Sequence, residues 1–154
     1  MTASKPLVEL QQFLPYRMAS TASHISQGLA QVYGQAPFSL ALAEWRILAQ
    51  LARSGEANAK VIAQLTDMDK TKVSRGVKTL EAKGLLHKRQ DSQDNRATNL
   101  SLNQQGWQLY RDLAPLALAW ESSLLSALTD AERQALFQIL DKLDRQLERP
   151  VLID

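Results

Sequence analysis

The chain has 154 residues, of which 45% are hydrophobic, and its formal net charge is +2. This length suits one domain with a sizeable core. With no cysteine and two histidines, disulfides, thiolate metal sites and cysteine nucleophiles are excluded, so we expect no metal and no cofactor. No apolar run reaches the ~20 residues of a membrane span. The start of the chain, MTASKPLVELQQ, lacks the apolar stretch of a signal peptide, so we expect a cytoplasmic protein without a membrane partner.

An amphipathic helix is predicted over residues 7–32, where apolar residues recur three and four positions apart. Pro15 lies inside this run, so the helix either begins or kinks there. A second helix is predicted over residues 39–53, ended by Ser54 and Gly55. Asn58 is a suitable N-cap for a short third helix over residues 58–68.

The next segment changes from helix to strand. A fourth helix is predicted from about residue 70, with Asp67 or Asp69 as its N-cap and Gly84 at its end. Residues 85–90 and 97–103 have the alternating pattern of strands, and the turn-forming sequence DSQDNR separates them. This pattern predicts a β-hairpin with a polar, charged tip.

Two helices are predicted after the hairpin. Residues 104–128 form a long apolar-periodic segment, and Pro115 inside it is expected to bend the helix. Thr129 and Glu132 have the spacing of a capping box, which opens the last helix. Leucines recur along that helix at heptad-like spacing, at positions 136, 140, 143 and 147.

Positive charge is concentrated between residues 69 and 96. That window holds eight Lys or Arg and four Asp or Glu residues, a net charge of +4, which leaves −2 for the rest of the chain. A local basic patch on a nearly neutral chain is typical of a polyanion-binding protein. A solvated lysine-rich surface would have the same composition.

The fourth helix has two chemically different faces. With about 100° per residue, Lys70, Ser74 and Lys78 fall on one face together with Thr71 and Arg75. The apolar residues of the segment share the opposite face; these are Val73, Val77 and Leu80. Gly76 lies beside the apolar face, where it would allow a neighbouring helix to approach closely.

The composition of the polar face favours DNA as the partner. Arginine bonds guanine bidentately, hydroxyl groups bond bases or phosphates, and lysine neutralises phosphate. A short helix, a turn, a cationic helix and a hairpin together predict a winged helix-turn-helix, whose second helix enters the major groove.

The hairpin would then be the wing. Arg96 at the base of its loop is a candidate for a narrow minor groove, and Asp94 could orient it by a charge-assisted bond; a local salt bridge in a turn explains the pair equally well. The predicted DNA-contacting residues are Lys70, Thr71, Lys72, Ser74, Arg75, Lys78, Lys88, Asp94 and Arg96.

The hairpin sequence KGLLHKRQDSQDNRATNLSLNQQG resembles a pattern of the MarR (multiple antibiotic resistance regulator) family: KGL, then D-x-R, then L-x-L-T-x-x-G. Residues 44–48 and 69–75 are similar to the family's second-helix segment and to the start of its recognition helix. The resemblance covers nearly the whole chain. Asn103 stands where the family usually has Thr, and asparagine can also cap a helix.

The resemblance implies a homodimer with a mainly α (α+β) fold. Residues 1–36 and 104–154 would form a helical dimerisation module, and residues 37–103 the DNA-binding lobe, within a single intertwined domain. The large apolar residues of the terminal helices agree with this, among them Trp107, Trp120, Leu136, Phe137 and Leu140. Two-fold symmetry would place two recognition helices about 34 Å apart on a pseudo-palindromic site. A monomeric helical bundle would explain the same apolar stripes.

The resemblance also implies a small aromatic or phenolic anion that releases a repressor from its operator. The candidate ligand-binding residues are Tyr16, Arg17, His24, Trp45 and Arg46. For each of them, a role in the core, in an interface or in a structural ion pair is the alternative.

Two other classes of function are alternatives to a DNA-binding regulator. An enzyme is disfavoured because the sequence has no cysteine, no H-E-x-x-H, no Gly-rich phosphate loop and no G-x-S-x-G. A winged-helix module for protein–protein interaction, without sequence-specific DNA binding, is the remaining alternative. The salt dependence of DNA binding separates the two, because phosphate contacts weaken steeply as salt rises.

Overall fold

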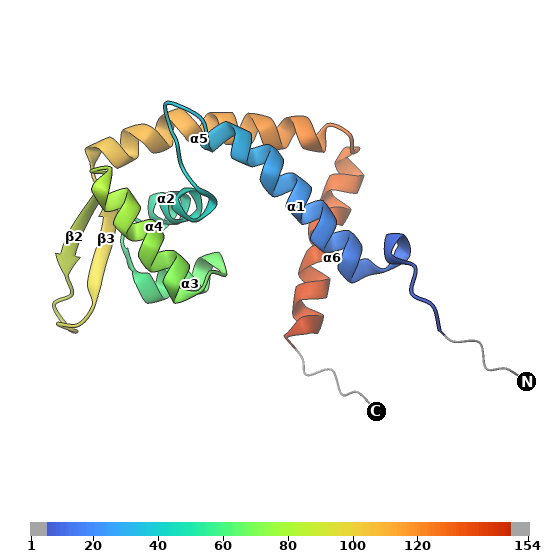
Figure 1. Ribbon diagram of the computed structural model, residues 1–154, viewed down its shortest axis with the longest axis horizontal. Coiled ribbons are helices and arrows are strands. Elements are labelled where there is room, and N and C mark those ends of the chain that lie inside the picture. The colour runs from blue at the N-terminus through green and yellow to red at the C-terminus, as the bar shows by residue number, and fades with distance from the viewer. Residues whose placement is uncertain (1–5, 149–154) are drawn as a thin grey trace, which may run out of the picture. The chain divides into compact units, whose positions relative to one another are not determined.

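The computed structural model describes residues 6–148 as a mostly helical chain with one small sheet (Figure 1). The chain divides into two compact units whose boundary lies within one long helix, between Ala117 and Leu118. The elements, in chain order, are the 3-10 helix η1 (Leu10–Gln12), α1 (Leu14–Tyr33), α2 (Leu42–Ser54), β1 (Ala57–Asn58), α3 (Ala59–Thr66), α4 (Lys70–Ala82), β2 (Leu86–Gln90), β3 (Thr98–Leu102), α5 (Gln104–Leu125) and α6 (Asp130–Leu147).

Backbone conformation determines where the first two helices begin. α1 starts at Leu14 with Pro15 in its first turn, so the proline begins this helix and does not kink it. α2 starts at Leu42, three residues later than predicted. The cause is Ser39, whose φ of 50° is left-handed, and the N–H of Leu40, which bonds the carbonyl of Tyr33 at 2.8 Å.

The helix-turn-helix is closed by side-chain caps. The Oδ1 of Asn58 accepts a bond from the N–H of Val61 at 2.9 Å, which confirms the predicted cap of α3. Asp67 ends that helix in a left-handed conformation, and Asp69 Oδ1 accepts from the N–H of Lys72 at 2.8 Å. Asp69 is therefore the cap of α4, and Asp67 is not.

The predicted hairpin is present as β2 and β3. These strands pair antiparallel, with Leu86 opposite Leu102 and Gln90 opposite Thr98. The two-residue strand β1 adds to the other side of β3, so the sheet order is β1-β3-β2. β1 was not predicted, because two residues carry no readable periodicity.

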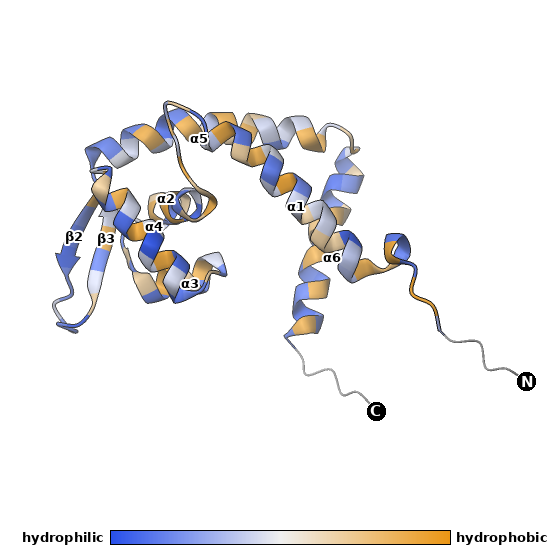
Figure 2. Cartoon of the chain, viewed as in Figure 1, coloured by the Kyte–Doolittle hydropathy of each residue, from blue (hydrophilic) through white to orange (hydrophobic). Residues whose placement is uncertain are grey.

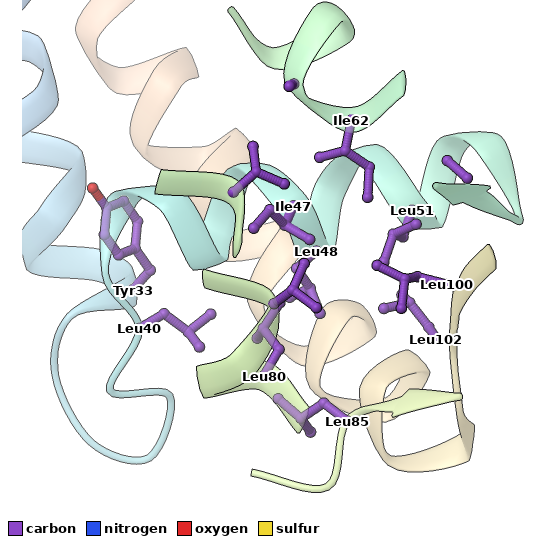
Figure 3. Close-up of a cluster of buried hydrophobic side chains, with 14 of the residues drawn as sticks. Tyr33, Leu40, Ile47, Leu48, Leu51, Ile62, Leu80, Leu85, Leu100 and Leu102 are labelled. Atoms are coloured by element: carbon purple, nitrogen blue, oxygen red, sulfur yellow. The ribbon is translucent and has the colours of Figure 1, made fainter. Parts of the chain in front are cut away.

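The core of the first unit surrounds α2 (Figure 3). Ile47, Leu48 and Leu51 of this helix are fully buried, as are Ile62 of α3 and Leu80 of α4. Full burial of one such side chain stabilises the fold by ~1.5–3 kcal/mol. This core fixes α3 and α4 as a pair against α2.

The capping box of the last helix is confirmed. The N–H of Thr129 bonds Glu132 Oε2 at 2.8 Å, and the N–H of Glu132 bonds Thr129 Oγ1 at 3.2 Å. α5 ends at Leu125, before the predicted Leu128, and its last carbonyl accepts a bond from Arg133 Nε at 3.0 Å. Pro115 lies inside α5, and the bend expected there stays a prediction.

The division into a dimerisation module and a DNA-binding lobe also stays a prediction. Residues 1–5 and 149–154 of the expected module lie outside the described residues, and residues 1–5 are also part of the N-terminal stretch that was expected not to be a signal peptide. Within residues 6–148, no helix is long and apolar enough to cross a membrane.

Candidate DNA-binding surface

α4 separates its buried and exposed residues as the sequence predicts. Val73, Gly76, Val77 and Leu80 are buried, and the helix packs against α2 and α3. A Cβ on Gly76 would lie 2.6 Å from Ile47 Cδ1, which shows how closely α2 approaches. The exposed residues of α4 include all six that were predicted to contact DNA; these are Lys70, Thr71, Lys72, Ser74, Arg75 and Lys78.

Most of these cations are not neutralised by the protein itself. Residues 6–148 contain three side-chain ion pairs, which join Lys83 to Glu44, Lys88 to Glu81 and Arg89 to Glu56. Among the predicted DNA-contacting residues, the exposed cations that belong to none of these pairs are Lys70, Lys72, Arg75, Lys78 and Arg96. Their charge is therefore available to phosphate groups.

Lys88 differs from the other predicted DNA-contacting residues. It lies on β2, and its ammonium contacts the carboxylate of Glu81 on α4. Any contact of Lys88 with phosphate would compete with this pair. The ion pair of Lys88 with Glu81 could not be predicted from the sequence, because the two residues belong to different elements.

The hairpin loop is organised by Asp91. Its Oδ1 accepts from the N–H groups of Gln93 at 2.8 Å and Asp94 at 3.2 Å, and its Oδ2 accepts from Asn99 Nδ2 at 3.1 Å. The backbone bond from Gln93, followed by those from Asp94 and Asn99, lowers the pKa of Asp91, with a smaller contribution from Arg89. An aspartate at this point therefore holds the loop in one conformation.

The predicted link between Asp94 and Arg96 runs through the backbone. Asp94 Oδ1 accepts from the N–H of Arg96 at 2.9 Å. No ion pair joins the two side chains in the described residues, so the expected charge-assisted bond is wrong in its donor. The Arg96 guanidinium is exposed beside a turn that Asp94 shapes.

A cleft of ≈ 420 Å³ lies between the hairpin and α3. Its lining includes Lys60, Lys88 and Arg96, with Asp94 as the acidic residue, over an apolar floor formed in part by Val77 and Leu100. Lys60 was missed by the sequence analysis. The available signal was its place in the first turn of α3, two residues after the cap Asn58.

The five candidate ligand-binding residues do not meet in one chain. Tyr16, Arg17 and His24 lie on α1, whereas Trp45 and Arg46 lie on α2. At about 1.5 Å per residue, Tyr16 is about 26 Å along α1 from Tyr33, the residue that contacts Trp45. Arg17 Nη1 bonds the carbonyl of Gln11 at 3.1 Å, which fixes η1 to α1.

A second aromatic residue accompanies Trp45 instead. The rings of Tyr33 and Trp45 stack with centroids 6.2 Å apart and an interplanar angle of 13°. Burial raises the pKa of Tyr33, and the nearby Arg46 opposes this shift. On the same helix, Trp45, Arg46 and Arg53 line an open cleft of ≈ 380 Å³. Tyr33 was not among the candidates, because nothing in the sequence distinguishes it from a core residue.

Comparisons with known proteins agree with this geometry. Residues 38–97 match the MarR family. The HTH-type transcriptional regulator YwaE of Bacillus subtilis (strain 168) is 29% identical over 105 residues, which cover 68% of this chain and 61% of YwaE.

Two solved structures superpose on nearly the whole chain. A MarR/EmrR family transcriptional regulator from Acinetobacter sp. ADP1 is 27% identical, with a TM-score of 0.82 over 92% of this chain and 99% of that one. Sco3205, a MarR family regulator from Streptomyces coelicolor solved in complex with DNA, has a TM-score of 0.82 at 17% identity, over 96% of this chain and 94% of that one. In its winged helix-turn-helix lobe and in its fold, the chain is similar to transcriptional regulators of the MarR family.

Proposed function

We propose that the protein is a homodimeric transcriptional repressor that binds a pseudo-palindromic DNA operator. The observation that carries this proposal is the exposed face of α4, where four cations have no acidic partner among residues 6–148. If this face were only a solvent-exposed helix surface, pairs of opposite charge three or four residues apart would stabilise the helix. Uncompensated cations beside hydroxyl groups match the major groove of DNA instead.

The residues of this surface divide into two kinds of contact. Arg75 would bond the O6 and N7 atoms of guanine through its guanidinium, while Lys70 and Lys78 would meet phosphates. Arg96 on the wing reaches the adjacent minor groove. Lys60 lines the same cleft as Arg96, so it would meet a backbone phosphate beside that minor groove.

Exposed apolar stripes support assembly as a dimer. On α1, Leu14, Met18 and Ile25 share one face and are 52%, 41% and 39% exposed. In the second unit, Phe137 and Ile139 of α6 are 51% and 52% exposed. Hydrophobic residues recur along both helices (Figure 2), and burial of their exposed side chains against a second copy would be favourable. Two-fold symmetry then pairs two recognition helices with two half-sites.

The effector we propose is a small aromatic anion. Trp45, which stacks on the buried ring of Tyr33, and Arg46 line one cleft, so an aromatic ring and a positive charge lie together there. Tyr16, Arg17 and His24 lie too far along α1 to join this group within one chain, so they would act there only from a second copy. The effector releases DNA if it binds a geometry of the dimer that cannot bind DNA more tightly than it binds the DNA-binding geometry.

Selection of bound sequences from a random DNA pool tests the proposal. We expect a consensus with two-fold symmetry, an affinity that falls steeply between 50 and 200 mM salt as about six or more phosphate contacts require, and a dimer by light scattering. Placed over a promoter, this consensus should lower reporter output. Tryptophan fluorescence then measures which members of a panel of phenolic acids bind the protein. An acid that binds should restore the reporter output. If the folded protein enriches no DNA sequence, the result would favour a winged-helix module for protein–protein interaction.

A further inference from the structure

Glu44 is the one charged residue in the described part of the chain that is buried, with 8% of its surface exposed. It lies in the first turn of α2, where its Oε2 accepts a bond from the N–H of Ala41 at 3.2 Å. An exposed glutamate would cap the helix equally well. Burial of a carboxylate is unfavourable unless the charge is paired, so this position calls for a partner.

The partner is Lys83, which comes from the far end of the recognition helix. Its Nζ donates to Glu44 Oε2 at 3.0 Å and to the carbonyl oxygen of Ser39 at 2.7 Å. Lys83 is the C-cap of α4, and Ser39 belongs to the connection between α1 and α2. The left-handed backbone of Ser39, at φ 50°, stands immediately before this connection enters α2. One ammonium group therefore joins three parts of the first unit.

This contact adds to the apolar packing of α4. In that packing Gly76 faces Ile47 of α2, and a Cβ at Gly76 would lie 2.6 Å from Ile47 Cδ1. Lys83 is seven residues further on, about 10 Å along the axis at about 1.5 Å per residue. The buried side chains of Val73, Val77 and Leu80 hold the middle of α4 against the core, and the contact of Lys83 adds a fixed point at the C-terminal end of the helix.

A pivot at Gly76 would move the DNA-facing end of α4. Lys70 lies six residues before Gly76, about 9 Å along the axis. A tilt of about 10° would displace that end by about 1.6 Å, which is enough to break hydrogen bonds of about 2.9 Å. The contact at Lys83 prevents this tilt from the opposite end of the helix.

We propose that Lys83 and Glu44 are positioning residues, which set the angle at which α4 is presented to DNA. The inference rests on the proposed DNA-binding function. It separates Lys83 from Lys70, Lys72 and Lys78 of α4, because its ammonium is engaged within the protein. Glu44 thereby contributes to DNA affinity although its own charge repels phosphate.

Electrostatics alone and a positioning role predict opposite effects of a substitution at Glu44 on DNA affinity. Removal of a negative charge by Glu44→Gln should strengthen DNA binding if electrostatics alone mattered. A positioning role predicts the reverse, a loss of about tenfold on the selected operator, as expected for well-oriented contacts that are misplaced by about 1 Å or more. Glu81→Gln is the matched control: it removes the same charge from α4 itself and should bind at least as tightly as the parent.

Lys83 is tested by the salt dependence of binding. Lys83→Met should lower affinity about tenfold while the slope of log K against log [salt] stays that of the parent. Loss of a phosphate contact would instead reduce the slope by about 0.9. Lys83→Arg keeps the charge and the donors and should restore most of the affinity. The Glu44→Gln, Lys83→Met double variant should be no weaker than either single variant.

Circular dichroism and light scattering confirm that each variant is folded and assembled as the parent is. Should Glu44→Gln fail to fold, the two Lys83 variants decide, because that side chain is 33% exposed. Residual dipolar couplings report the angle between α2 and α4 without DNA, and this angle should change in Lys83→Met. An unchanged angle, or undiminished binding by folded Glu44→Gln, overturns the inference. Failure of the parent to bind any sequence contradicts the proposed function instead.

Discussion

The α-carbon of Gly106 lies against the carbonyl oxygen of Leu85, at the place where α5 leaves the wing. A Cβ at Gly106 would be 2.3 Å from that oxygen and 3.3 Å from Leu102 Cβ. The same carbonyl accepts a bond from the N–H of Asn103 at 3.1 Å, and Asn103 caps α5 through the N–H of Gly106 at 2.9 Å. The hairpin and α5 are therefore joined backbone to backbone.

Gly106→Ala should destabilise the protein by about 1–3 kcal/mol, because the atom that a new methyl group meets belongs to the backbone. The gain in helix propensity, about 1 kcal/mol, offsets only part of this cost. Urea unfolding measures the difference. Gly76→Ala is the comparison, since its Cβ meets the end of the Ile47 side chain, which can shift; equal losses for both variants would contradict this explanation.

Acid should loosen the wing before it unfolds the rest of the lobe. The pKa of Asp91 is lowered from its ordinary value of 3.8, so its stabilising bonds are present above the unfolded pKa and are lost as pH falls through the folded pKa. We expect the amides of Gln93 and Asp94 to lose protection from hydrogen exchange below about pH 3.8. Asp91→Ala should show the unprotected amides at every pH, and retained protection in this variant would contradict the role of Asp91.

Arg75 and Lys78 should differ in what they contribute to DNA binding. Arg75→Ala is expected to cost about 1–3 kcal/mol and to relax sequence preference at one position, because a guanidinium reads a base edge. Lys78→Ala should weaken all sequences alike and reduce the salt slope by about 1. Fluorescence anisotropy on the operator and its single-base variants distinguishes the two; an unchanged preference in Arg75→Ala would remove that side chain from the base edges.

Arg96 and Lys60 line one cleft, yet we expect them to respond differently to the sequence beside the operator. Arg96→Ala should lose more affinity on A·T-rich flanks, where a narrow minor groove attracts arginine. Lys60→Ala should lose the same amount on both kinds of flank, as a phosphate contact does. Two DNA duplexes that differ only in their flanks measure this. Equal losses for Arg96→Ala on both would argue against its placement in the minor groove.

Local signals in the sequence predicted the winged lobe well. The caps at Asn58 and Asp69, the glycine after α4 and the alternation of Leu100 and Leu102 each depend on neighbours within a few residues. The same holds for the two faces of α4, because a helix of known period places its residues by spacing alone. Fold and candidate surface therefore followed from short-range pattern.

Contacts between distant segments could not be predicted in this way. Lys83 and Glu44 are 39 residues apart, and no periodicity relates them. The pair of Lys88 with Glu81 crosses from a strand to a helix. The candidate ligand residues failed to converge for a related reason: the sequence indicates that Tyr16 and Trp45 lie on helices, but only the packing shows which end of α1 meets α2.

The sheet order has a consequence for how the wing behaves at high protein concentration. β3 is covered on both sides, and β1 is too short to template another strand, which leaves β2 as the one open edge of useful length in the described sheet. Open edges invite intermolecular pairing. His87, Lys88 and Arg89 follow one another along this edge, and β2 is hydrophilic for most of its length in Figure 2. Lys88 and Arg89 carry acidic partners, so two wings that approached edge to edge would have to bury or break these ion pairs, which protects the wing against aggregation.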